Sequence, residues 1–352
     1  MFFDIDACKN CFVDPNGTIK DAIKSIESGG FKIALVTENH NLYGTVCDGD
    51  IRRGILKGID LTASVREIMQ TKFVRFCDKN PKEDLDKKCK ENNISQIPIL
   101  SESGLLKGLF VQNEILPISS TKSLPNYALI MAGGKGLRLR PLTENCPKPL
   151  LPVNGKPILE IIIQQCIKAG INKFFISVHY LSEKIVNYFG DGSNWGIEIK
   201  YIYEDNPLGT AGAMQFLKGK IKDSILVING DLLTKVNFND IFNYHKKNDA
   251  EITICVRENN IKSPYGIIEV EGIKYMKMTE KPTFKYLVNA GIYIFKHTVI
   301  DTIKEKESID MPELIERSKS LNKNIIVYPI HEYWLDIGRH ESLTKAHTEW
   351  IL

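Results

Sequence analysis

The segment from Leu129 to Leu159, LIMAGGKGLRLRPLTENCPKPLLPVNGKPIL, contains the residue types that bind phosphate groups. Its glycines let backbone N–H groups approach an anion, and Arg138 and Lys148 add positive charge. Two common phosphate-loop patterns do not fit. No Gly-x4-Gly-Lys-(Ser/Thr) is present, and Leu139 stands where Gly-x-Gly-x-x-Gly needs its third glycine. Because the prolines that follow exclude a helix, we expect an irregular loop that presents these groups to phosphates.

Strands and helices alternate from Tyr127 onward, which predicts an α/β domain with a mainly parallel sheet. In open sheets of this kind, ligands bind at the carboxyl ends of the strands, where the strand order changes. The glycine-rich loop directly follows the first strand, so we expect it at that edge. The expected strands are 127–133, 173–180, 199–204 and 225–231, and the expected helices are 158–170, 182–190 with Ser182 as cap, and 210–220.

The first third of the chain repeats itself with a period of 64 residues, so that Gly44 falls on Gly108 and the strand 33–36 on 97–100. Each copy predicts a polar helix, a β-branched strand, a turn, a strand that opens at the glycine, and a helix that starts at an acidic residue. Proline and serine residues then interrupt both periodicities and indicate a linker.

Composition excludes several classes of protein. The 352 residues carry 46 basic and 43 acidic side chains, a net charge of +3, which predicts no nucleic-acid or membrane partner. The first residues lack a signal-peptide pattern, and no uncharged apolar run reaches about 18 residues. Of eight cysteines, only Cys8 and Cys11 form a C-x-x-C pair, and no second pair completes a zinc site. We expect free thiols and a cytoplasmic protein.

The repeat resembles a tandem pair of CBS motifs, which form one compact α+β module and often bind adenine nucleotides. In that family an Asp late in a Gly-x-x-(Ser/Thr)-x-x-Asp pattern contacts the ribose. The first copy keeps Asp50 but has Cys47 at the hydroxyl position, and the second has Val111 and Glu114. The resemblance makes Asp50 the candidate contact for an adenine nucleotide. The alternative is a structural or dimerising module, and face-to-face pairing of such modules makes a homodimer the expected state.

The glycine-rich segment resembles the signature of sugar-1-phosphate nucleotidyltransferases, Gly-x-Gly-(Thr/Ser)-Arg-(Leu/Met)-x-Pro followed by Pro-Lys-Pro. Leu137 departs from the usual Thr or Ser. The resemblance covers about 127–349 and implies a Rossmann-like, GT-A-type α/β domain with a mainly parallel sheet. Similar segments continue in order at 203–214, 227–233, 263–270, 279–282, 288–295 and 334–343. We therefore predict a CBS module over 1–118 (copies at about 1–60 and 61–118), a linker over 119–126 and a nucleotidyltransferase domain over 127–352.

The family's reaction joins a nucleoside triphosphate and a sugar 1-phosphate to give a nucleotide sugar and pyrophosphate. A phosphate monoester has its second pKa at about 6, so the nucleophile is already ionised and no general base is needed. Catalysis is then positioning and charge neutralisation. The resemblance implies a Mg²⁺ ion between the phosphates, with Asp231 and Asp336 as its ligands.

The same resemblance assigns roles to further residues. Arg138 is expected to hold the β- and γ-phosphates, and Lys148 the α-phosphate or the attacking phosphate. Lys281 is expected to bind the sugar phosphate. The other nucleotide contacts implied are Met131, Ala132, Gly133, Gly134, Gly136, Gly209 and Thr210, and the other sugar contacts are Gly266, Glu280 and Asn289.

The base is predicted from Glu204, which stands where similar enzymes have a Gln that reads uracil or thymine. A carboxylate only accepts hydrogen bonds, and guanine offers two adjacent donors, N1–H and N2–H₂, so we expect GTP. The chain as a whole resembles CBS-fused glucosamine-1-phosphate guanylyltransferases of bacterial legionaminic acid pathways. The alternatives are mannose- or heptose-1-phosphate guanylyltransferases, uridylyl- or thymidylyltransferases, and a CBS-based nucleotide sensor whose catalytic half is inactive.

Overall fold

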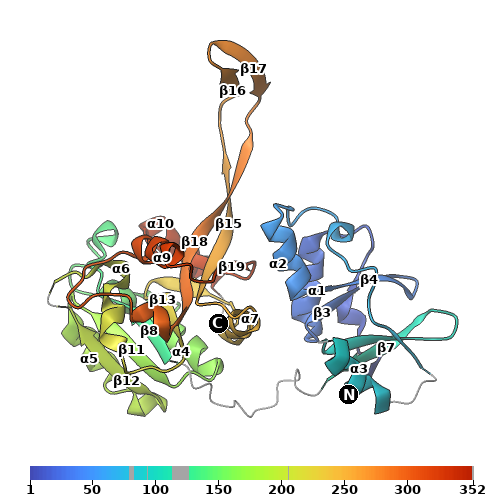
Figure 1. Cartoon of the computed structure of the whole chain (residues 1–352), viewed down its shortest axis with the longest axis horizontal. Coiled ribbons are helices and arrows are strands. Elements are labelled where there is room, and N and C mark those ends of the chain that lie inside the picture. The colour runs from blue at the N-terminus through green and yellow to red at the C-terminus, as the bar shows by residue number, and fades with distance from the viewer. Residues whose placement is uncertain (79–82, 93, 113–126, 205, 351–352) are drawn as a thin grey trace. The chain divides into compact units, whose positions relative to one another are not determined.

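The computed structural model divides the chain into two compact units, Met1–Ser120 and Thr121–Leu352 (Figure 1). The structure describes residues 1–78, 83–92, 94–112, 127–204 and 206–350. The predicted linker 119–126 and Glu114 lie outside these residues. Within the described residues, no helix is both long and apolar enough to cross a membrane.

The first unit contains two copies of one motif, and equivalent elements recur at the predicted period. Both copies contain a short strand that pairs in parallel with the first strand of an antiparallel hairpin, so the repeat is present in the fold. The first copy comprises β2 (Phe12–Val13), α1 (Ile19–Gly29), β3 (Ile33–Glu38), β4 (Asn41–Cys47) and α2 (Asp48–Leu56). The second comprises β5 (Phe76–Cys77), α3 (Glu83–Asn92), β6 (Gln96–Leu100) and β7 (Leu106–Val111), with β1 (Phe2–Asp4) paired to β7.

The prediction that a strand begins at Gly44 and another at Gly108 is wrong, because β4 and β7 begin before these glycines. Both glycines lie inside a strand, where another backbone approaches closely. A Cβ on Gly44 would lie 2.9 Å from the carbonyl oxygen of Gln70, and one on Gly108 would lie 2.1 Å from that of Phe3. Each glycine therefore leaves room for a neighbouring backbone beside its strand, and neither glycine marks the beginning of a strand.

Helix α1 shows why the local sequence folds as it does. The Thr18 hydroxyl accepts from the Asp21 backbone N–H at 3.2 Å, and the Asp21 carboxylate accepts from the Thr18 N–H at 3.0 Å. This capping box begins the helix, and Gly30 with φ 72° ends it. Ile19 and Ala22 bury the inner face against β3 and β4.

The second unit is built on a seven-stranded sheet in the order β12-β11-β8-β13-β18-β15-β19. Strands β12, β11, β8 and β13 are mutually parallel, and β18 runs antiparallel to both of its neighbours. The prediction of a mainly parallel α/β domain is confirmed. The strands are β8 (Tyr127–Met131), β11 (Lys173–Val178), β12 (Glu198–Tyr203), β13 (Ser224–Asn229), β15 (Ile252–Lys262), β18 (Thr283–Lys296) and β19 (Ile325–Ile330).

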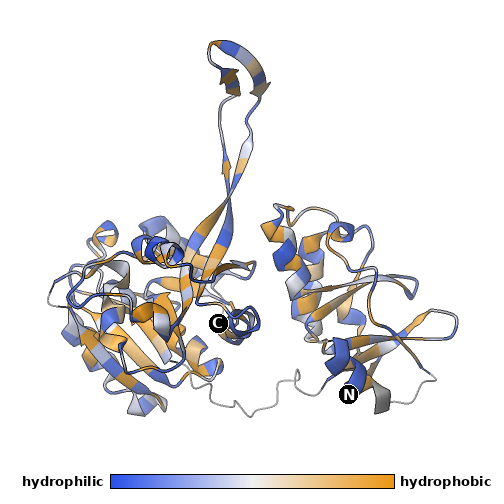
Figure 2. Ribbon diagram, in the orientation of Figure 1, coloured by the Kyte–Doolittle hydropathy of each residue, from blue (hydrophilic) through white to orange (hydrophobic). Residues whose placement is uncertain are grey.

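Helices cover both faces of this sheet, which explains why its central strands are continuously apolar. In β8, Ala128 and Ile130 pack into one core cluster and Leu129 into the other, and Figure 2 shows the hydrophobic colouring of these inner strands. One face carries α4 (Ile158–Lys168), α5 (Ser182–Phe189), α7 (Phe238–Lys247) and α10 (His340–Glu349). The other carries α6 (Gly209–Gly212), η6 (Ala213–Leu217), α8 (His297–Ile300) and α9 (Met311–Ser320).

Two expectations for these helices are wrong. Helix α5 is preceded by Leu181 in the left-handed region, and Ser182 is its first residue rather than its cap. The continuous helix expected over 210–220 is instead one α-helical turn followed by a 3-10 segment. Tertiary packing overrides propensity there, because Gln215 donates to the carbonyl oxygen of Glu307 at 3.1 Å.

A long hairpin projects from the sheet, as Figure 1 shows. Strands β15 and β18 remain paired beyond the sheet, from Glu258 with Leu287 to Lys262 with Thr283. Beyond them, β16 (Ile267–Glu271) pairs with β17 (Lys274–Thr279). We call residues 258–287 the arm. The remaining short elements are β9 (Pro152–Val153), β10 (Lys156–Pro157), β14 (Leu232–Thr234), β20 (Trp334–Asp336), η1 (Lys9–Cys11), η2 (Val65–Glu67), η3 (Leu137–Leu139), η4 (Lys148–Leu150) and η5 (Ser193–Trp195).

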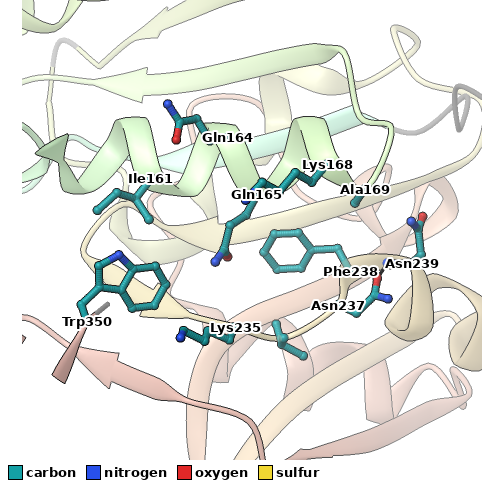
Figure 3. Close-up of a pocket in the computed structure, with 11 residues that line it drawn as sticks. Ile161, Gln164, Gln165, Lys168, Ala169, Lys235, Asn237, Phe238, Asn239 and Trp350 are labelled. Atoms are coloured by element: carbon teal, nitrogen blue, oxygen red, sulfur yellow. Dashed lines mark hydrogen bonds between the residues drawn. The ribbon is translucent and has the colours of Figure 1, made fainter. Parts of the chain in front are cut away.

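A cavity of about 450 Å³ lies between α4 and the segment that leads into α7 (Figure 3). Gln165 crosses it to donate to the carbonyl oxygen of Thr234, and Trp350 closes one end. Its described lining contains no carboxylate, histidine or cysteine, and the titratable side chains there are those of Lys168 and Lys235.

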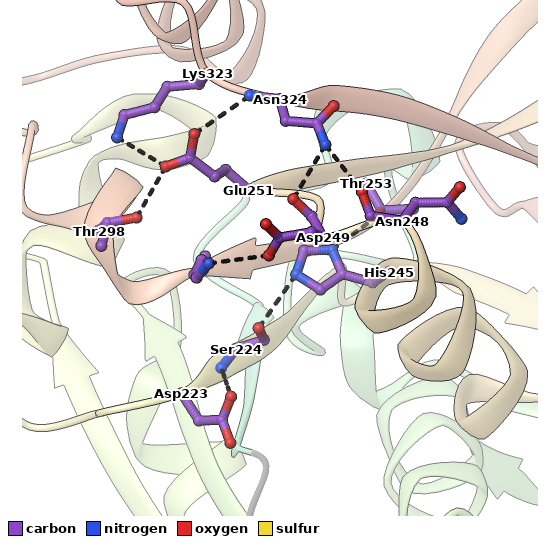
Figure 4. A network of polar contacts seen from close by, with 11 residues as sticks. Asp223, Ser224, His245, Asn248, Asp249, Glu251, Thr253, Thr298, Lys323 and Asn324 are labelled. Carbon is purple, nitrogen blue, oxygen red and sulfur yellow. Dashed lines mark hydrogen bonds and ion pairs between the residues drawn. The ribbon is translucent and has the colours of Figure 1, made fainter.

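His245 lies at the centre of a buried polar network (Figure 4). Its Nδ1 is 2.8 Å from the Thr253 hydroxyl and its Nε2 is 3.2 Å from that of Ser224. Burial, and then the charge of Lys296, lower the pKa of His245 from 6.5 to about 4. Both ring nitrogens are engaged, so the neutral ring fits this site.

This pKa predicts a loss of stability in mild acid. The unfolded chain binds a proton at His245 below pH 6.5, whereas the folded protein does so only near pH 4. The free energy of unfolding should therefore fall as the pH drops through this window, by at most about 3 kcal/mol. Urea unfolding at several pH values measures this. His245→Gln should flatten the dependence and His347→Gln, at an exposed site, should not; equal slopes in both variants would contradict the prediction.

Candidate active site

A cleft of about 580 Å³ opens where the carboxyl ends of β8, β11, β12 and β13 meet. The strand order reverses here, because the chain runs from β8 outward to β12 and returns to β13 on the other side of β8. The cleft therefore lies at the predicted edge of the sheet. Its lining is Met131, Ala132, Gly133, Gly134, Lys135, Lys148, Pro149, His179, Glu204, Pro207, Gly209, Thr210, Asn229, Gly230 and Asp231.

The glycine-rich loop folds tightly over the segment that carries Lys148. Gly136 has φ 62°, and its carbonyl oxygen accepts from the Thr143 hydroxyl at 2.8 Å. A Cβ on Gly136 would lie 3.0 Å from Cγ2 of Thr143 and 3.1 Å from Cβ of Lys148. Gly136 therefore does not line the cleft, and it supports the cleft by packing closely against Thr143 and Lys148.

This geometry predicts that Gly136→Ala destabilises the fold. The left-handed backbone and the two close contacts should lower the free energy of unfolding by about 1–2 kcal/mol. Gly134→Ala is the matched control, because nothing lies within 4 Å of its added Cβ. Urea unfolding of both variants measures the difference. Equal stability of the two variants would contradict the assigned role of Gly136.

Lys148 and Asp231 form an ion pair at the floor of the cleft. Lys148 is buried, and Asp231 directly follows β13. Strand β14 pairs antiparallel with β20, which places Leu232 opposite Asp336. The Ile337 N–H also donates to the Asp231 carbonyl oxygen at 3.0 Å. The fold thus brings Asp231 and Asp336, distant in sequence, side by side.

The surroundings of Asp336 disfavour its charged form. Partial burial, and then the carboxylate of Asp231, raise the pKa of Asp336, while Lys148 and Arg138 act in the opposite direction. Two adjacent carboxylates favour a bound cation, which would offset their mutual repulsion. Carboxylate oxygens are the ligands that Mg²⁺ prefers, so this donor set fits the predicted metal.

Arg138 is exposed on η3, at the rim of the site rather than in the cleft lining. A Cβ added to Gly338 would lie 3.8 Å from its guanidinium and 3.3 Å from the Asp336 carboxylate. Arg138 and Asp336 therefore flank the same backbone. Trp334 secures this segment by donating from Nε1 to the Ala290 carbonyl oxygen at 2.8 Å.

Glu204 lies at the other end of the cleft, at the end of β12. One carboxylate oxygen accepts from the Ser177 hydroxyl, and the other accepts from the Leu208 N–H at 3.1 Å. The Glu204 side chain faces the cleft and is held in one orientation by these two donors. Each carboxylate oxygen has a second lone pair available to a ligand.

Gly209 and Thr210 also line the cleft, but their polar groups are engaged within the protein. The Thr210 N–H and hydroxyl donate to Asp310 at 2.9 and 3.2 Å, and the hydroxyl accepts from the Met311 N–H at 2.7 Å. A Cβ on Gly209 would lie 2.6 Å from the carbonyl oxygen of Ile309. Asp310, which holds this wall of the cleft in place, was not predicted from any sequence motif.

The predicted sugar contacts do not join the cleft of their own chain. Gly266, Glu280 and Lys281 lie on the arm, and the described lining of the cleft includes no arm residue. Asn289 lies on β18, where its Nδ2 donates to the Tyr293 hydroxyl at 2.5 Å and its Oδ1 accepts from the Gly291 N–H at 3.0 Å. The structure thus assembles the predicted nucleotide side of the site and leaves the sugar side open.

Three polar residues of the cleft were not among the predicted contacts. Lys135, His179 and Asn229 all line the cleft. The His179 Nδ1 lies 2.8 Å from the Glu204 carbonyl oxygen. The available signal was their position: Lys135 lies in the loop that follows β8, His179 directly follows β11, and Asn229 ends β13.

Asp50 in the first unit borders a separate cavity of about 430 Å³. Its carboxylate accepts from the Cys47 N–H at 2.8 Å, from Arg53 at 2.6 Å and from Gln70 at 2.7 Å. Asp50 is thus a helix-capping residue with a filled set of internal donors. Cys8 and Cys11 of this unit are buried thiols, and burial raises their pKa to about 12 and about 11.

Comparisons with known proteins agree with this arrangement. The nucleotidyl transferase family model matches residues 127–351, and the CBS domain model matches residues 4–57. The mannose-1-phosphate guanylyltransferase of Mycobacterium tuberculosis is 29% identical over 231 residues, which are 64% of this chain and 64% of that protein. The bifunctional protein GlmU of Methanococcus maripaludis is 34% identical over 236 residues, 64% of this chain and 54% of that protein.

The chain therefore spans less than two thirds of the length of these relatives. The crystal structure of HddC from Yersinia pseudotuberculosis, complexed with GMP-PN, superimposes with a TM-score of 0.51 and 22% identity, covering 64% of this chain and 99% of that one. This likeness shows a shared fold. Together with the family match over the whole second unit, it shows that the chain belongs to the nucleotidyl transferase family and carries a CBS domain ahead of the transferase domain.

Proposed function

We propose that the chain transfers a nucleotidyl group to a sugar 1-phosphate, giving a nucleotide sugar and pyrophosphate. The observation that carries this proposal is the convergence of the glycine-rich loop, Lys148, Asp231 and Asp336 at one edge of the sheet. Such a site offers N–H groups, cations and paired carboxylates but needs no general base. It fits the reaction of two anionic substrates.

Asp231 and Asp336 would hold Mg²⁺, which supplies charge neutralisation between the phosphates when bound. Lys148 is paired with Asp231 in the structure, so it stands beside the point where the phosphates would meet. Arg138, exposed at the rim, would grip the β- and γ-phosphates that leave as pyrophosphate. Gly133 and Gly134 line the cleft, and without side chains they would let their backbone approach the nucleotide closely.

We propose GTP as the nucleotide. Glu204 faces the cleft with a fixed carboxylate, and guanine presents two adjacent donors to such an acceptor. The curated relative from M. tuberculosis is named a mannose-1-phosphate guanylyltransferase, which supports guanylyl transfer. Glucosamine 1-phosphate is the leading sugar from the whole-chain resemblance, and mannose 1-phosphate is the alternative that this relative supports.

A pyrophosphate-release assay with Mg²⁺ tests the proposal. It would combine GTP, UTP, dTTP, CTP and ATP with glucosamine-, N-acetylglucosamine-, mannose- and glucose-1-phosphate. Selective turnover of GTP is expected. Preference for UTP or dTTP would contradict the assigned role of Glu204. Absence of turnover with every pair, with and without an adenine nucleotide for the CBS unit, would favour a regulatory protein instead.

A further inference from the structure

The arm is an amphipathic two-stranded sheet whose apolar face has no partner in the described part of the chain. Ile268 pairs with Met278 and Val270 with Tyr275, so these four side chains share one face. They are 57%, 52%, 62% and 64% exposed, respectively. The opposite face pairs Glu269 with Lys277 and Ile267 with Thr279, so it is the more polar of the two. An isolated two-stranded hairpin is marginally stable in water, so this apolar face needs a covering surface.

The base of the arm holds it away from the cleft of its own chain. The ladder between β15 and β18 continues unbroken from Val256 with Asn289 to Lys262 with Thr283. At about 3.4 Å per residue, this stretch spans about 20 Å before β16 begins. Folding the arm back onto its own cleft would break these backbone pairs. A surface on a second molecule can meet the arm without breaking them.

The arm also carries a group of polar residues just beyond the last pair of the β15–β18 ladder, Lys262 with Thr283. The Ser263 N–H donates to the Pro282 carbonyl oxygen at 2.9 Å and closes the two strands there. A Cβ on Gly266 would lie 2.8 Å from the Glu280 carboxylate, so the backbone of Gly266 lies next to this side chain. Lys281 follows with φ 44°. These are the residues that the sequence assigns to the sugar and its phosphate.

The cleft has few cationic side chains, and the arm carries one in Lys281. Among the described residues that line it, the cations are Lys135 and Lys148, and Lys148 is already paired with Asp231. Arg138 at the rim and a bound Mg²⁺ would add positive charge for the nucleotide, but this described lining offers no further unpaired cation beside Lys135 for the sugar phosphate. Lys281 of another molecule would supply it.

We propose that the arm of one copy docks through its apolar face on a second copy of this chain and that its Glu280 and Lys281 complete the second copy's cleft. A two-fold axis makes the exchange reciprocal, so both clefts are completed and both apolar faces are covered. The role of Lys281 rests on the proposed function, whereas the docking of the arm does not. This interface differs from the pairing of CBS modules expected from the sequence.

Mixing two inactive variants tests the catalytic part. Lys281→Gln keeps a working cleft and Asp231→Asn keeps a working arm, and the two are co-expressed at equal levels. Exchange in trans gives one complete site in each mixed dimer, so about one quarter of the wild-type activity should return. An arm that acts on its own chain returns none, and that result would overturn the proposal. Lys281→Gln mixed with Glu280→Gln is the control and should recover nothing.

Cross-linking tests the docking independently of activity. Chains labelled with ¹⁴N and ¹⁵N are mixed, incubated until native mass spectrometry shows that their subunits have exchanged, treated with an amine-reactive cross-linker and analysed by mass spectrometry. Hybrid cross-links between Lys277 or Lys281 on one chain and Lys135 on the other are expected. Val270→Asp should lower their yield about tenfold, and Glu269→Gln, on the opposite face, should leave it unchanged. Links within single isotopes only, or no link between arm and cleft, would overturn the proposal even if the chain transferred no nucleotide.

Discussion

Replacing Asp231 by asparagine should lower kcat about 10³-fold while leaving the fold intact. The substitution removes one of the two carboxylates that β14 and β20 bring together, and with it the charge that would hold Mg²⁺. Asparagine retains an oxygen that can accept from Lys148, so the buried ammonium keeps a hydrogen-bond partner. The measurement is the initial rate of pyrophosphate release, with the melting temperature recorded alongside.

Asp301→Asn is the matched control, because it makes the same chemical change at an exposed residue that lies outside the cleft lining. Its rate should equal that of the wild type. Mn²⁺ binding followed by electron paramagnetic resonance adds a readout independent of turnover, and the affinity of Asp231→Asn should fall. Near-normal turnover or unchanged Mn²⁺ affinity would show that Asp231 is not a metal ligand.

Glu204→Gln should change which nucleotide the chain prefers. The ratio of kcat/KM for GTP to that for UTP should fall about 10²-fold, because one acceptor for the guanine donors becomes an amide donor. The folded structure should tolerate the change. The glutamine oxygen can accept from the Leu208 N–H, and the amide can donate to the hydroxyl of Ser177.

The control for this change is Glu198→Gln, at an exposed position on the same strand, β12. It should leave the ratio of the two nucleotides unaltered. An unchanged ratio in Glu204→Gln would mean that other groups in the cleft read the base, with Asn229 and His179 as the nearest described candidates.

Short-range signals explain what the sequence predicted correctly. The alternating elements gave the parallel sheet, and the rule for open sheets placed the glycine-rich loop and Glu204 at its carboxyl edge. Errors occurred where tertiary packing decides local structure. The segment after Thr210 is held by Asp310 and Gln215 rather than by helix propensity, and Gly44 leaves room for the backbone of Gln70.

Long-range placement could not be predicted from local patterns. The motif that contains Glu280 and Lys281 was recognisable, but the length of the β15–β18 ladder decides where these residues lie. Likewise, the pairing of Leu232 with Asp336 brings the carboxylates of Asp231 and Asp336 together. A contact between residues so far apart in the chain leaves no periodic pattern in the sequence.

The most direct test of the central claim follows oxygen atoms through the reaction. The protein is incubated with unlabelled GTP, Mg²⁺ and either glucosamine or mannose 1-phosphate that carries ¹⁸O in the three non-bridging positions of its phosphate. The masses of the products are then measured by mass spectrometry. Attack of the sugar phosphate on the α-phosphorus predicts a GDP-sugar that retains all the label and a pyrophosphate that contains none. Label in the pyrophosphate, or GMP and GDP formed without a nucleotide sugar, would contradict the account.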